Sequence, residues 1–136
     1  MAQNYVSPGW GSSADYAAAG LPWVFSGVAA SNTTALQFNF EYVSKQITIK
    51  NNATAGGGSV CFGFTRNGTQ NGPERYEVSP LEYITLDCRI KELFIIASGS
   101  ATNVPFSIHA SLTLIPEYNM PILTASAAGS NWDGVG

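Results

Sequence analysis

Charge is scarce in this sequence of 136 residues, and what there is lies unevenly along the chain. Charged side chains make up 11% of the residues, less than half of the roughly 25% that is usual in soluble domains. All six Lys and Arg residues fall between positions 45 and 91, and the formal net charge is −3. Nucleic-acid-binding surfaces are built from clustered Lys and Arg, so we expect no nucleic-acid partner. Because such a neutral surface is poorly suited to full exposure to water, we expect much of it to contact other protein.

Signals for export and for membrane insertion are also missing. The first 44 residues contain no Lys or Arg, whereas a signal peptide starts with a basic segment. No apolar run approaches the roughly 20 residues that a membrane-spanning helix needs. We therefore expect a protein that is made in the cytoplasm, without a signal peptide, and that has no membrane partner.

Cysteine and histidine are too few for most metal or thiol-based sites. The spacing of Cys61 and Cys88 matches no zinc motif, and one histidine, His109, cannot complete such a site. We expect free, buried thiols that pack as small apolar groups, with a disulfide as the alternative. His109 is predicted on the polar face of its strand, so Cys61 lacks an obvious general base. A carboxylate pair for sugar hydrolysis stays open, because its separation is a three-dimensional quantity. The sequence predicts no metal site, no cofactor and no catalytic residue.

Residues 56–72, GGGSVCFGFTRNGTQNG, combine features of several functional motifs. The triple glycine is not followed by the lysine and the helix that a phosphate-binding loop requires. The N-x-[ST] pattern within it is an acceptor for N-linked glycosylation, which matters only in a secretory compartment. We interpret the stretch as a strand with Val60, Phe62 and Phe64 facing the core, between a glycine loop and an Asn-Gly turn.

Alternation of apolar and polar side chains predicts an all-β chain of about eight strands. The clearest case is residues 104–115, VPFSIHASLTLI, which with residues 89–98 form the two longest predicted strands. Residues 66–73 are predicted as a long turn, and residues 13–20 as the one possible helical turn. The other predicted strands cover residues 22–29, 34–41, 43–51, 60–65, 75–79 and 82–88.

The strand pattern favours a single antiparallel β-sandwich, jelly-roll-like or a related Greek key. We assign residues 21–116 to this domain, with extended arms at residues 1–20 and 117–136. Both arms are nearly uncharged but contain spaced aromatic residues, unlike most disordered tails. We predict that they bind a partner surface, and local packing of the termini is the alternative. The predicted partner-binding residues are Tyr5, Trp10 and Tyr16 in the first arm and Tyr118, Ile122 and Trp132 in the second.

Two stretches carry a resemblance to a known group of proteins. ITIKNNATAGGGSVCFGFTRNG and YITLDCRIKELFIIASGSATNVPFSIHASLTLI resemble the small β-sandwich virion proteins of tailed phages that decorate or cement the outside of the capsid. The similarity is one of strand and hairpin pattern and covers roughly residues 36–115. It implies a structural, non-enzymatic protein of the virion, made in the host cytoplasm. Its implied partners are the major capsid protein or another virion protein, together with further copies of itself, with a trimer favoured.

Two other classes of function remain alternatives. A carbohydrate- or receptor-binding β-sandwich, from a fibre or another minor virion component, has the same strand pattern. A hydrolase requires His109 beside a nucleophile, or two carboxylates in one cleft.

Overall fold

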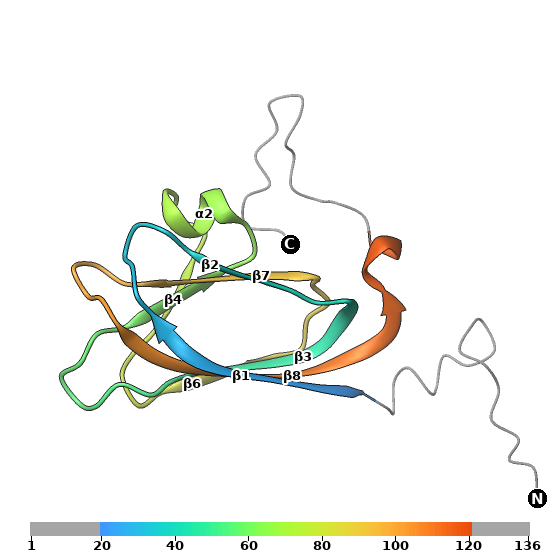
Figure 1. The fold of residues 1–136 in the computed structure, drawn as a ribbon, viewed down its shortest axis with the longest axis horizontal. Coiled ribbons are helices and arrows are strands. Elements are labelled where there is room, and N and C mark those ends of the chain that lie inside the picture. The colour runs from blue at the N-terminus through green and yellow to red at the C-terminus, as the bar shows by residue number, and fades with distance from the viewer. Residues whose placement is uncertain (1–19, 121–136) are drawn as a thin grey trace, which may run out of the picture.

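In the computed structural model, which describes residues 20–120, the chain is a sandwich of two four-stranded antiparallel sheets (Figure 1). The predicted all-β sandwich is therefore confirmed. Sheet A has the strand order β1 (Leu21–Ala29), β8 (Val104–Pro116), β3 (Tyr42–Asn51) and β6 (Tyr83–Leu86). Sheet B has the order β2 (Leu36–Asn39), β7 (Glu92–Ala97), β4 (Val60–Gly63) and β5 (Tyr76–Val78).

The strand pairings are nested in the manner of a jelly roll. β1 pairs with β8, β2 with β7, β3 with β6 and β4 with β5, all antiparallel. The chain thus forms one long antiparallel ribbon that is rolled up. The pairing of β3 with β8 and of β4 with β7 joins neighbouring parts of this ribbon into the two sheets. This arrangement of eight strands is the jelly-roll form of the Greek-key sandwich.

The core lies between the sheets and follows the predicted alternation. In β8, Phe106, Ile108 and Ala110 are almost fully buried, whereas His109 between them is exposed. They pack in one cluster with Ile49 of sheet A and Ile95 of sheet B. Period-2 alternation in a strand with one solvated face is the pattern that such burial requires.

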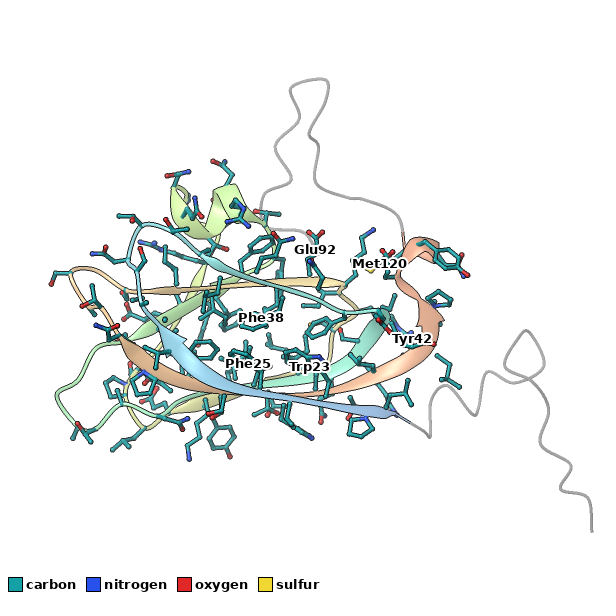
Figure 2. The ribbon with its side chains drawn as sticks, viewed as in Figure 1. Trp23, Phe25, Phe38, Tyr42, Glu92 and Met120 are labelled. Atoms are coloured by element: carbon teal, nitrogen blue, oxygen red, sulfur yellow. The ribbon has the colours of Figure 1, made fainter. Side chains whose placement is uncertain are left out.

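An aromatic cluster closes the side of the sandwich where β1 and β2 form the sheet edges. Figure 2 shows Trp23 and Phe25 of β1 and Phe38 of β2 meeting between the sheets. The ring centroids of Trp23 and Phe38 lie 5.9 Å apart, and those of Phe25 and Phe38 lie 4.8 Å apart, in edge-to-face geometry. Each such pair contributes about 0.5–1.5 kcal/mol beyond its buried area. The cluster therefore holds β1 in place, although within residues 20–120 β1 has a neighbouring strand on one side alone.

A buried amide connects the two layers at one end of the sandwich. Asn51, the last residue of β3, is fully buried, and its Nδ2 donates to the carbonyls of Gly58 (3.0 Å) and Val78 (2.9 Å). Its Oδ1 accepts from the backbone N–H of Ala53 (2.8 Å). Since Val78 belongs to β5, the side chain joins sheet A to sheet B.

The prediction of a long turn over residues 66–73 is wrong, because a short helix, α2 (Arg66–Gln70), begins there. The Thr65 hydroxyl accepts a hydrogen bond from the N–H of Gly68 (3.1 Å) and caps the first turn. The helix packs against β4 and β7, where the Arg66 guanidinium lies 5.3 Å from the Phe94 ring centroid. Capping and tertiary contact thus override the turn preference of the two Asn-Gly pairs.

The strand expected over residues 89–98 is shorter than predicted, since β7 covers Glu92–Ala97 and the longest strands are β8 and β3. The backbone just before β7 is shared between the two sheets, since Ile90 bonds to Ser44 of β3 in sheet A whereas Lys91 bonds to Phe40, which directly follows β2 of sheet B. The Ile90 N–H donates to the Ser44 hydroxyl (2.9 Å), and the Lys91 carbonyl accepts from the N–H of Phe40 (2.9 Å). After β8, a 3-10 turn, η2 (Glu117–Asn119), ends the described chain.

Candidate functional site

The outer face of sheet A is an array of mostly neutral polar side chains. The strands align these side chains in rows, and side chains on adjacent strands hydrogen-bond to each other. The hydroxyl oxygens of Thr48 and Thr85 lie 3.0 Å apart, and those of Ser26 and Ser107 lie 3.3 Å apart. The Asn52 amide donates to the Ser107 hydroxyl at 2.6 Å. This face offers many hydrogen-bonding groups and little charge.

A shallow hollow of about 420 Å³ lies on this face beside β1. Val24, which is 72% exposed, provides apolar surface at one side of it. Lys50 and His109 contribute the two ionisable groups among the lining residues, and no carboxylate is among them. Its lining residues are Val24, Phe25, Ser26, Thr48, Lys50, Ser107, Ile108 and His109. The hollow is suited to binding a surface or a small group and has no cluster of ionisable groups for acid–base chemistry.

The free edge of sheet A is its most apolar exposed part. β1 is an edge strand of nine residues without a charged side chain. Val24 and Val28 are 72% and 46% exposed, and Leu21 and Phe25 are each 38% exposed. Exposed apolar side chains that gather on one element mark an interaction site more often than scattered ones do.

The structure places Cys61 and His109 in different layers. Cys61 is buried in β4 of sheet B, whereas His109 lies exposed on the outer face of sheet A, as expected. Burial raises the pKa of the Cys61 thiol above its ordinary value of 9.0, although a hydrogen bond with Ser98 and the charge of Arg75 oppose this. His109 is therefore not the general base of a Cys61 nucleophile.

Both cysteines are free thiols, and they differ in burial. Cys61 packs with Ala35, Phe94 and Ile96 in a small apolar cluster of sheet B, as a small hydrophobic side chain. Cys88 is half-buried, which is less than expected, and burial followed by the charge of Asp87 raises the pKa of its thiol.

Of the six predicted partner-binding residues, Tyr118 is the one that falls within the described chain. It is 77% exposed on η2. That turn is attached to the sandwich, because the Glu117 N–H donates to the Glu41 carbonyl (3.0 Å) and the Lys91 ammonium lies 3.8 Å from the Glu117 carboxylate. The other five, Tyr5, Trp10, Tyr16, Ile122 and Trp132, lie outside the described residues.

The described part of the chain holds neither a metal-binding cluster nor a membrane-spanning helix. Within residues 20–120, no three His, Cys, Asp or Glu side chains are grouped so that they could hold a metal ion. No helix in that range is long and apolar enough to cross a membrane.

Comparison with known proteins gives no family assignment. No protein-family profile matches the chain, and no curated protein matches it significantly. Its function is therefore inferred from its residues and its fold.

Sequence reasoning missed the free edge as a candidate surface. The segment at residues 22–29 is predicted as a strand, and its lack of charge is visible in the sequence. Whether a strand lies at an edge depends on pairings between residues about 80 positions apart, such as Phe25 with Ile108. No local pattern contains that information.

Proposed function

We propose that this chain is a structural virion protein that binds the outer surface of a capsid as a decoration or cement protein. It acts without enzymatic chemistry, through protein–protein contacts that tie neighbouring capsid subunits together. Its partners are the major capsid protein or another virion protein, and further copies of the chain.

The observation that carries the proposal is the combination of a jelly roll with an outer sheet of mostly neutral polar side chains. Viral capsid proteins and lectins are among the proteins that use jelly rolls, although a fold alone does not determine a function. The outer face of sheet A has Ser, Thr and Asn side chains in cross-strand pairs, and its free edge bears exposed Val24 and Val28. Such a surface favours broad contact with another protein over recognition of a charged ligand.

The arms are the proposed source of additional contact area. A specific interface buries at least about 1,000 Å² in total. Tyr118, exposed at the end of the sandwich, is an aromatic side chain of the kind that carries binding energy at interfaces. The contacts of Glu117 with Glu41 and Lys91 hold the turn that bears it. We propose that Tyr118 and the aromatic residues of the two arms contact the capsid.

Binding to capsids tests this proposal. The purified full chain is mixed with capsids that lack it, from the virus that encodes it, and co-sedimentation and the heat stability of the shell are measured. We expect saturable binding and a shell that survives to a higher temperature. Deletion of residues 1–16 or of residues 117–136 is expected to weaken binding. Undiminished binding by both truncated chains contradicts the role of the arms, and no binding by the full chain contradicts the proposal.

A carbohydrate-binding module is the second candidate, and one observation favours it. Tyr83 is 69% exposed on the outer face of sheet A, in register with Lys50, beside the hydroxyl pairs of that face. A flat aromatic ring next to neutral hydrogen-bonding groups suits a sugar ring. Screening against a glycan array separates the two, because the decoration protein predicts no saturable sugar binding.

A further inference from the structure

The hydrogen-bonding pattern of β8 shows which backbone groups of β1 have no strand partner within residues 20–120. The N–H of Asn52 donates to the carbonyl of Pro105 (2.9 Å), so Pro105 directs its backbone oxygen toward β3. Directions alternate along a strand, so Phe106, Ile108 and the alternate residues after them direct their backbone groups toward β1. Proline at position 105 is consistent with this assignment, because that position supplies a backbone acceptor toward β3 and proline has no N–H to donate there.

The register with β1 then divides that strand into two sets. Gly27 and Phe25 are opposite Phe106 and Ile108, so the odd-numbered residues of β1 bond to β8. The even-numbered residues therefore direct their backbone groups to the free edge. Proline removes the donor at position 22, and the N–H groups of Val24, Ser26 and Val28 remain, next to their carbonyl oxygens. Such a row is a template for pairing with another strand.

The other three sheet edges are short and protected by polar contacts. β6, β2 and β5 have four, four and three residues. Asp87, just after β6, accepts from Gln46, and Glu77 of β5 accepts from Ser98. In β2, the Gln37 side chain accepts from Arg66 of α2 (2.7 Å). Natural sheets limit edge pairing by such shortness and charge, whereas β1 has nine uncharged residues.

We propose that β1 pairs antiparallel with β1 of a second copy of this chain, across a two-fold axis, so that sheet A continues through both subunits. An antiparallel pair of identical strands is self-complementary, as an isologous interface requires. Because β1 bears no charge, the pairing places no like charges opposite one another. This inference concerns the chain itself and does not depend on capsid binding.

The available area is sufficient for such a dimer. A strand of nine residues is about 30 Å long, and the β2 edge lies in a second layer about 10 Å away. A strip of about 30 by 20 Å on each subunit gives about 1,200 Å² in total, which reaches the range of specific interfaces. Val24, Val28, Phe25 and Leu36 are all at least 38% exposed and supply its apolar part.

The first experiment measures the solution mass of the full chain by light scattering over a range of concentrations. We expect a dimer of 28.8 kDa, twice the subunit mass of 14.4 kDa. Val24→Lys places a like charge on both of the paired edges and is expected to weaken self-association at least about tenfold. Thr85→Lys is the matched control, because Thr85 is exposed in the same cross-strand row at the opposite edge of sheet A. The control is expected to leave the dimer intact.

A second variant and a second readout keep the test decisive if Val24→Lys folds poorly. Ser26→Pro removes one free N–H without breaking the ladder to β8, and edge strands tolerate proline. It is expected to weaken the dimer while circular dichroism stays unchanged. In the wild type, amide exchange of Val24, Ser26 and Val28 is expected to slow as concentration rises.

Three outcomes overturn the inference. One is a monomer at high concentration whose β1 edge amides exchange rapidly. Another is a monomer whose edge amides exchange slowly until residues 1–19 are deleted, which identifies that segment as the occupant. The last is a trimer or other oligomer that Val24→Lys leaves unchanged. A dimer that fails to bind capsids supports the pairing of β1 and contradicts the proposed function, so the two failures are distinguishable.

Discussion

Replacing Asn51 with alanine is expected to destabilise the sandwich strongly, because this amide joins the two sheets. The substitution leaves the carbonyls of Gly58 and Val78 and the N–H of Ala53 without their partner. An unpaired buried backbone group costs about 1–3 kcal/mol. Two of the groups are carbonyls, which tolerate a lost partner better, so we expect a loss of about 3–5 kcal/mol in the free energy of unfolding.

The neighbouring residue provides a matched control for this prediction. Asn52 is half-buried and makes one side-chain hydrogen bond, to the Ser107 hydroxyl on the outer face. Asn52→Ala is expected to cost about 0.5–1 kcal/mol. For a domain of this size, 1 kcal/mol corresponds to about 4 °C in Tm. Thermal unfolding followed by circular dichroism is therefore expected to show a decrease of about 12–20 °C for Asn51→Ala and about 2–4 °C for Asn52→Ala. Equal shifts for the two variants refute the role given to Asn51.

Three further predictions concern the helix, a close glycine contact and the thiols. Thr65→Ala removes the cap of α2 and is expected to cost about 1 kcal/mol in urea unfolding; an unchanged midpoint contradicts the cap. Gly63→Ala places a Cβ against the Thr69 hydroxyl and is expected to lower the free energy of unfolding by about 1–3 kcal/mol. A variant that is as stable as the wild type refutes the close contact. Burial raises the pKa of Cys61 and of Cys88 above 9.0, so the unfolded thiols ionise first and the free energy of unfolding falls as pH rises above 9.0. We expect Cys61→Ala to reduce this fall, and an identical pH slope in wild type and variant contradicts it.

Much of the fold follows from the sequence because burial alternates along the strands. Phe106, Ile108 and Ala110 face one layer and His109 faces water, and that period of two is visible in the order of the residues themselves. The helix α2 is not predictable in the same way, since Asn-Gly pairs favour turns. Its existence depends on the Thr65 cap and on packing against β7, and the second of these is a contact between distant parts of the chain.

The candidate surface is less predictable than the fold, for a related reason. The sequence of β1 shows its lack of charge, but the free N–H groups of Val24 and Ser26 follow from strand order and register. Likewise, the separation of Cys61 from His109 follows from their placement in different sheets. Such long-range pairings decide which predicted residues meet, and local patterns do not encode them.

The central claim is that the chain is a structural component of a virus particle, and the composition of purified virions tests it most directly. Quantitative mass spectrometry of particles separated by density gradient measures its copy number relative to the major capsid protein. We expect a constant ratio across preparations, consistent with regular placement on the shell. Virions from which the chain is absent, or in which its amount varies from one preparation to the next, contradict the account.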